Sequence, residues 1–167
     1  MNGMRQTVLA GLALLVLLVP APAQAQSGRP TFRAVRYVMP VEALVIDPFR
    51  PPAHIGAPGN RGLEFGNDHD HLVVAAADGL VTFAGSVAGR QIITVHHPDN
   101  VRTTYTGMSE VWVAENGHVE QGESIGRADA NLHFGARSGR HYLDPQVLLD
   151  ASTEETRARL LPTSNPN

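Results

Sequence analysis

Short apolar runs separated by turn residues dominate the chain from residue 41 onward. Runs that alternate apolar and polar positions, or that are rich in Val, Ile and Thr, are typical of β-strands. The pattern predicts strands at 41–46, 72–77, 80–84, 91–96, 101–106, 111–114 and 132–137. Because these runs are short and closely spaced, they predict an all-β fold with a compact antiparallel sheet or sandwich and little helix.

Turn residues indicate how the runs are connected. Asp78-Gly79 lies between two apolar runs and predicts a β-hairpin that pairs the strands on either side of it. The Pro-rich segment 47–60 is incompatible with a central strand, so we expect a loop there and an edge strand at 41–46.

Helix is expected only near the C-terminal end. Asp144 followed by Pro145 has the pattern of an N-cap and a first helical residue, and predicts a single turn through Leu149. Residues 152–161 begin with a sequence that resembles a capping box, and predict a short helix within a C-terminal tail at 151–167.

The first 25 residues have the pattern of a secretory signal peptide. One arginine precedes an apolar run at 8–19, and Ala-Gln-Ala at 23–25 is a small-x-small cleavage sequence. The run is short for a membrane span, so an uncleaved N-terminal anchor is the less favoured alternative. We expect cleavage after residue 25, a linker at 26–40, a core domain at 41–150, and no membrane span in the mature chain.

Composition narrows the classes of function. The 167 residues fit one domain beyond the leader. The formal net charge is −3, so the chain lacks the basic excess typical of nucleic-acid binding. The absence of cysteine excludes a disulfide framework, a Cys-based zinc site, a thiol nucleophile and a lipid-modified cysteine. A secreted chain without disulfides is expected in a bacterial cell envelope.

Eight histidines prompt a search for a metal site. His69 and His71 are two residues apart, so in a strand they share one face and could hold a metal. We favour the simpler interpretation, two solvated imidazoles beside acidic neighbours. Adjacent His96 and His97 face opposite sides of a strand and cannot chelate one ion together.

Several motifs occur in an order and spacing that resemble one family. They are Asn-Arg-Gly-Leu-Glu at 60–64, Ala-Ala-Asp-Gly at 76–79, Thr-Tyr-Thr-Gly-Met at 104–108, Val-Glu-Gln-Gly-Glu-Ser-Ile-Gly at 119–126, Asn-Leu-His-Phe at 131–134 and Tyr-Leu-Asp-Pro at 142–145. Over about residues 41–149 the chain resembles the LytM/lysostaphin-type peptidoglycan metallopeptidases. The resemblance implies a duplicated hybrid motif fold with a long open groove.

The resemblance also implies a zinc site and two histidines that assist attack of water on a peptide bond. The three ligand positions, a His, an Asp and the second His of an H-x-H motif in the family, are Asn60, Glu64 and His133 here. The two assisting positions are Gly107 and Asn131. Only His133 is unchanged and Glu64 keeps a carboxylate, so the resemblance implies a degenerate member.

A catalytic zinc ion needs about three protein ligands, so we expect no bound cofactor and no catalysis. The alternative is an active zinc endopeptidase whose site is rebuilt by His54 or His69. Without a metal, we expect His133 to pair with Glu64, while the two asparagines at family positions and Tyr105 complete a polar groove.

These expectations favour one function over two others. We expect a secreted domain without peptidase activity that binds peptidoglycan or regulates a cell-wall hydrolase, because degenerate members of the family act as activators of other envelope enzymes. The expected partners are therefore peptidoglycan or an envelope hydrolase, and not nucleic acid. The rebuilt zinc endopeptidase is the second interpretation, and a structural or adhesive module with a vestigial groove is the third.

Overall fold

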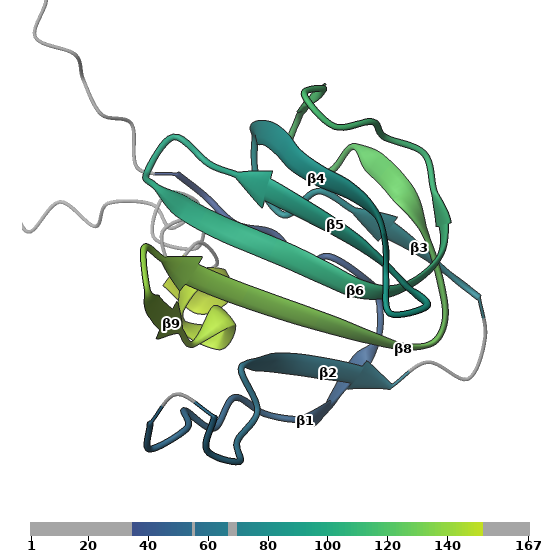
Figure 1. Ribbon diagram of the computed structural model, residues 1–167. Coiled ribbons are helices and arrows are strands. Elements are labelled where there is room, and N and C mark those ends of the chain that lie inside the picture. The colour runs from purple at the N-terminus through teal and green to yellow at the C-terminus, as the bar shows by residue number, and fades with distance from the viewer. Residues whose placement is uncertain (1–34, 55, 67–69, 152–167) are drawn as a thin grey trace, which may run out of the picture. The chain divides into compact units, whose positions relative to one another are not determined.

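The computed structural model describes residues 35–54, 56–66 and 70–151 of the chain (Figure 1). All of these residues belong to one compact unit, Arg33–Asn167. The expected signal peptide at 1–25 and the expected helix at 152–161 lie outside the described residues. In the described part of the chain, no helix is long and apolar enough to cross a membrane.

Within the described residues, nine strands form one antiparallel sheet. The strands are β1 (Leu44–Asp47), β2 (Gly62–Gly66), β3 (His71–Val74), β4 (Gly79–Val87), β5 (Arg90–His96), β6 (Val101–Val111), β7 (His118–Val119), β8 (Ser124–Ser138) and β9 (His141–Leu143). Their order across the sheet is β1-β2-β8-β6-β5-β4-β7, and β3 and β9 each pair with β8. The predicted all-β antiparallel fold is confirmed.

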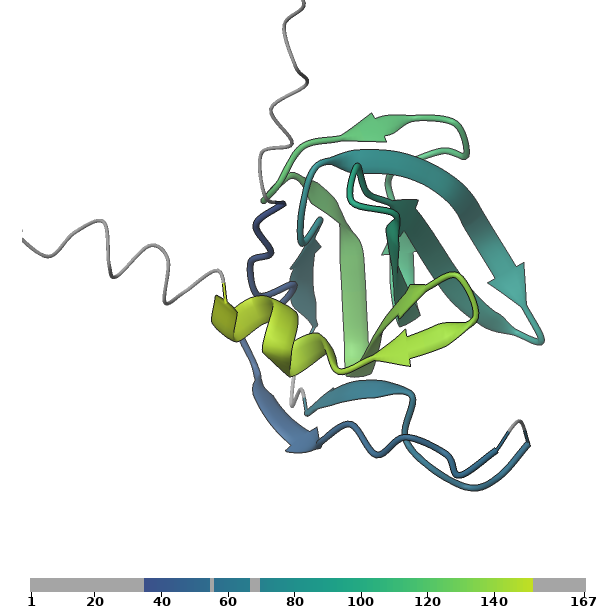
Figure 2. The ribbon, with the colours of Figure 1, turned by 90° about the vertical axis from the view of Figure 1, so that its left-hand side faces the viewer.

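The long strand β8 organises the sheet. Along its 15 residues it pairs with β3, β2 and β9 on one side and with β6 on the other. Figure 1 shows β8 beside β6, and Figure 2 shows the strands curving around the core. Alternate side chains of β5 and β6 point into this core, because successive residues of a strand face opposite sides.

The predicted hairpin at Asp78-Gly79 is wrong. β3 pairs with β8, whereas β4 pairs with β5 and β7. A two-residue hairpin of this kind requires positive φ angles, and those occur at Ala88 (φ 50°) and Gly89 (φ 79°), between β4 and β5. Gly79 serves close packing instead, since a Cβ there would lie 2.6 Å from a methyl carbon of Val95.

Other predicted elements differ mainly in their extent. Strand β6 is continuous through Val111, and residues 112–114 are not a strand. Strand β8 starts eight residues before the predicted 132–137, because glycine and charged residues mask its alternating pattern. The short strands β2, β7 and β9 were not predicted. They are too brief to show a period of their own.

The predicted edge strand and helix cap are present with shifted bounds: the strand covers Leu44–Asp47 instead of 41–46, and the helix runs beyond the single turn predicted through Leu149. Strand β1 pairs with β2 alone and ends the path through the sheet. Residues 145–151 are helical, and the backbone N–H of Gln146 donates to Oδ1 of Asp144 at 2.9 Å. The side chain of Leu149 anchors this helix in the core.

Part of the segment expected to be a linker packs on the domain. Tyr37 is 3% exposed, and its hydroxyl donates to the carboxylate of Asp99 at 2.9 Å. The backbone N–H of Val38 donates to the carbonyl of Ala76 at 2.8 Å. The packed region of the chain therefore includes residues before position 41.

Candidate functional site

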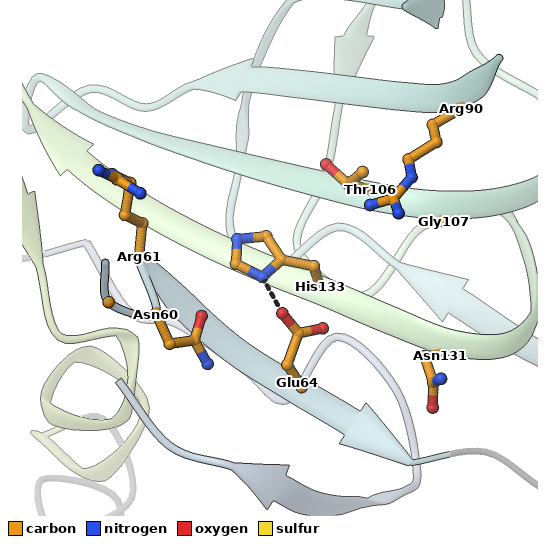
Figure 3. Close-up of a pocket in the computed structure, with 9 residues that line it drawn as sticks. Asn60, Arg61, Glu64, Arg90, Thr106, Gly107, Asn131 and His133 are labelled. Atoms are coloured by element: carbon orange, nitrogen blue, oxygen red, sulfur yellow. Dashed lines mark hydrogen bonds and ion pairs between the residues drawn. The ribbon is translucent and has the colours of Figure 1, made fainter. Parts of the chain in front are cut away.

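Strands β2 and β8 bring the family's second and third ligand positions together. Glu64 and His133 lie directly opposite each other in the antiparallel register. Nδ1 of His133 and Oε1 of Glu64 are 2.6 Å apart, and both side chains are about one-third exposed (Figure 3). The expected pairing is present, so the carboxylate and the imidazole already use each other as partners.

Gly62 sets the position of this pair. A Cβ at residue 62 would lie 2.3 Å from the carbonyl oxygen of Phe134 and 2.8 Å from Cε1 of His133. Only a glycine lets β2 approach β8 this closely with the imidazole in its present place.

Asn60, at the family's first ligand position, has a structural role. Its amide nitrogen donates to the carbonyls of Asp47 and Pro48, each at 3.2 Å, and its amide oxygen accepts from the N–H of Gly62 at 3.3 Å. Its backbone exchanges two hydrogen bonds with Arg50. The residue therefore closes the Pro-rich loop, and it does not bond with Glu64 or His133 as the expected groove floor required.

The donors at these positions do not match a zinc site. The three positions offer one imidazole and one carboxylate that bond to each other, and a neutral amide that is already occupied by backbone groups. Among the described residues, no group of three or more His, Cys, Asp and Glu could hold a metal ion. His54 is exposed on the Pro-rich loop and does not line the pocket. His69 lies outside the described residues.

Gly107 and Asn131 occupy the positions of the family's assisting histidines. Gly107 has φ 95° at a register shift in β6, and a Cβ there would lie 2.4 Å from the carbonyl oxygen of Asn131. The Asn131 side chain is exposed and points away from the Glu64–His133 pair in Figure 3. Neither residue offers a group that transfers protons at pH 7.

The Gly107 geometry predicts that a histidine cannot simply be restored there. Gly107→His is expected to lower the melting temperature by about 5–10 °C, because the new Cβ collides with backbone. Gly89→His is the matched control, since Gly89 also has positive φ but has no atom within 4 Å of a Cβ. Thermal unfolding of both variants checks the prediction. Equal melting temperatures for the two variants would contradict it.

Tyr105 does not line the groove. It is fully buried, its ring centroid lies 5.3 Å from that of Phe134, and its hydroxyl accepts from the N–H of Ala76 at 2.8 Å. Burial raises the pKa of Tyr105 to about 12. In the alternating pattern of β6, the groove face carries Thr104 and Thr106, and Tyr105 points the opposite way.

A pocket of about 740 Å³ surrounds the Glu64–His133 pair (Figure 3). Its lining consists of Gly59, Asn60, Arg61, Glu64, Arg90, Thr106, Gly107, Asn131 and His133. Sequence reasoning missed the two arginines. Arg61 lies between two ligand positions of the motif at 60–64, and Arg90 follows a turn that the sequence pattern does not predict. Two arginines and one carboxylate therefore line the pocket.

Arg61 is held in place by two neighbours. Its guanidinium donates to the carbonyl of Ala57 at 3.2 Å and lies 5.5 Å from the ring centroid of Tyr142. The cation is therefore fixed between the pocket and strand β9. Such a pocket suits an anionic ligand better than a cation.

Comparison with known proteins supports this reading of the motifs. The model of "Peptidase family M23" matches residues 58–145. The chain is 31% identical over 161 residues to the uncharacterized protein Rv2891 of Mycobacterium tuberculosis, covering 89% of this chain and 61% of the relative. It is 29% identical over 106 residues to the murein hydrolase activator NlpD of Escherichia coli, covering 59% of this chain and 27% of NlpD.

Solved structures share the fold. Lysostaphin, the antimicrobial peptidase from Staphylococcus simulans, aligns with a TM-score of 0.58 and 20% identity, over 75% of this chain and 56% of lysostaphin. A chain of the SpoIIQ–SpoIIIAH pore-forming complex aligns with a TM-score of 0.61 and 20% identity, over 77% of this chain and all of that chain. The chain thus spans about 61% of the mycobacterial relatives and has the lysostaphin-type fold.

Proposed function

We propose that the chain, which belongs to peptidase family M23, is a secreted domain without peptidase activity. It acts in the bacterial cell envelope by binding peptidoglycan or by regulating a cell-wall hydrolase. The fold of the family is retained, but the side chains at the site do not supply the groups that peptidase activity needs. Zinc is not expected as a cofactor.

The direct bond between Glu64 and His133 is the observation that carries the proposal. Nδ1 of His133 and Oε1 of Glu64 lie 2.6 Å apart, so these two donors engage each other. A third donor is missing because the Asn60 amide bonds to backbone groups. General acid and base groups contribute roughly 10²–10⁴-fold to such a reaction, and Gly107 and Asn131 provide none.

The envelope role is supported by two independent features. Residues 1–25 have the pattern of a signal peptide. One relative, NlpD, is a murein hydrolase activator, and the similarity to NlpD covers 59% of this chain. A protein that activates a hydrolase needs a binding surface and no catalytic centre of its own.

Zinc content distinguishes this proposal from an active peptidase. After incubation with zinc and gel filtration, the wild-type chain is expected to retain less than about 0.1 zinc per chain, because two donors leave a weak site. The variant Asn60→His/Glu64→Asp rebuilds the family's ligand set and is expected to retain about one zinc. Elemental analysis of both proteins measures this. One zinc per wild-type chain that is lost in His133→Ala would overturn the proposal.

Binding assays test the positive part of the proposal. Purified sacculi should co-sediment with the chain, or an envelope hydrolase should be stimulated by it, while the chain alone releases no peptidoglycan fragments. Absence of both binding to sacculi and binding to envelope hydrolases would reject the proposed role even if the chain holds no zinc.

A further inference from the structure

One cross-strand row of the sheet gathers basic side chains from far apart in the sequence. In order across the sheet, its residues are Tyr142, Arg137, Arg102, His96, Leu80 and His118. Each faces its neighbour directly in the register of adjacent strands. We call Arg102 and Arg137, the two central arginines of this row, the basic strip.

The basic strip lies on the same face of the sheet as the pocket. Arg137 is four residues from His133 on β8, and Arg102 is four residues from Thr106 on β6, in an unbroken register. Because alternate residues share a face, the strip is displaced from the pocket by about 13 Å along the strands. Both arginines are exposed.

Arg61 connects the pocket and the strip. It lines the pocket, and its guanidinium lies over the ring of Tyr142, which is opposite Arg137. The row between the pocket and the strip consists of Gly62, Gly135 and Thr104, and both glycines are buried. An extended ligand that reaches from the pocket to the strip would therefore pass along Arg61.

The strip is electrostatically unfavourable in the isolated chain. Arg102 and Arg137 are like charges directly opposite each other, an arrangement that destabilises a sheet. Neither forms an ion pair or hydrogen bond in the described part of the chain, whereas Arg50 and Arg127 pair with Asp47 and Asp70. The chain as a whole carries a net charge of −3, so a basic excess does not explain the arrangement.

We infer that the basic strip is an anion-binding subsite that holds carboxylate groups of peptidoglycan peptides. Two adjacent guanidinium groups match a carboxylate in charge and in hydrogen-bond geometry. Peptide stems that carry free carboxylates supply such groups at intervals along an extended chain, which fits an open face better than an enclosed pocket. The inference rests on the proposed function, and it names the chemical groups that the domain recognises.

Co-sedimentation with sacculi of two kinds tests the inference. One sample keeps its carboxylates, and in the other they are converted to amides with carbodiimide and ammonia. Arg102→Gln/Arg137→Gln is compared with Arg50→Gln/Arg127→Gln, which changes the net charge equally but removes arginines that are already paired. Thermal unfolding confirms that each variant is folded.

The strip variant is expected to bind native sacculi at least about tenfold more weakly than wild type, because it loses charge-assisted hydrogen bonds. The control variant should stay within about threefold, and amidated sacculi should weaken wild-type binding as much as the strip substitutions do. Equal binding by the strip variant and the control would overturn the inference and leave the proposed function standing. Failure of the wild-type chain to bind native sacculi would overturn this inference together with the peptidoglycan-binding part of the proposed function.

Discussion

Gly62→Ala is expected to lower the free energy of unfolding by about 2–4 kcal/mol. The added methyl group would lie 2.3 Å from the Phe134 carbonyl oxygen and 2.8 Å from the His133 ring. Backbone cannot yield as a flexible side chain can, so strands β2 and β8 must separate. Because the imidazole is displaced too, the 2.6 Å contact between His133 and Glu64 should be lost. Urea unfolding, followed by the fluorescence of Trp112, the chain's one tryptophan, measures the first effect.

A glycine in the same sheet provides the control for Gly62→Ala. At Gly85 on β4 a Cβ would meet nothing closer than 3.5 Å, from the ring of Phe83. Gly85→Ala should therefore change the free energy of unfolding by less than about 1 kcal/mol. Any stabilisation would come from the lower conformational entropy of the unfolded chain when alanine replaces glycine. Similar stability of the two variants would show that β2 and β8 do not approach as closely as described.

His97→Phe is the second substitution with a large expected effect, a loss of about 2–4 kcal/mol. His97 is 1% exposed, and its two ring nitrogens each lie 2.8 Å from an oxygen, Nδ1 from the Asp78 carbonyl and Nε2 from the Thr103 hydroxyl. The carbonyl can only accept, so Nδ1 carries the hydrogen and Nε2 accepts from Thr103. Phenylalanine leaves the fully buried hydroxyl of Thr103 without this partner.

The same residue makes the fold sensitive to acid. Burial lowers the pKa of His97. The hydrogen bond to the Asp78 carbonyl and the nearby carboxylates of Asp99 and Asp78 only partly oppose this lowering, while His96 adds to it. The Tyr37 ring packs edge-on against the His97 ring, with the two ring centroids 5.2 Å apart. An unfolded histidine titrates near pH 6.5, so below that pH the unfolded chain binds more protons than the folded chain. Stability from neutral His97 is therefore complete above about pH 6.5, and it falls as the pH drops from there to the depressed pKa of the folded chain.

Urea unfolding at pH 5, 6 and 7.5 checks this behaviour. Wild type should lose stability from pH 7.5 to pH 5, and His97→Phe should lose less over the same interval, because it has no proton to take up at this site. Thr103→Val is the matched variant, because it removes the hydroxyl that hydrogen-bonds to His97 and keeps the His97 imidazole, which takes up the proton. If His97→Phe and wild type have the same pH dependence, His97 is not the acid-sensitive group.

Part of the site could be predicted from the sequence because the motifs at 60–64 and 131–134 resemble motifs that hold one ion in a known family. The resemblance implies that Glu64 and His133 lie close together, and the expected pair is present. The role of Asn60 could not be predicted, because its partners Asp47 and Pro48 are brought to it by loop closure. Tyr105 was expected in the groove, but the position of the register shift at Gly107 and the alternation along β6 place it in the core.

The sequence by itself determined the local features of this protein. Alternating apolar positions set which face of β5 and β6 is buried, and Asp144-Pro145 set the start of the helix, because these preferences depend on neighbouring residues alone. Only the tertiary structure decided the partners. Strand β3 pairs with β8 and not with β4, which follows it in the sequence, and Arg102 lies opposite Arg137. Pairing between strands that are distant in the sequence depends on the packing of the whole core. Turn residues and apolar periods carry no information about such long-range choices.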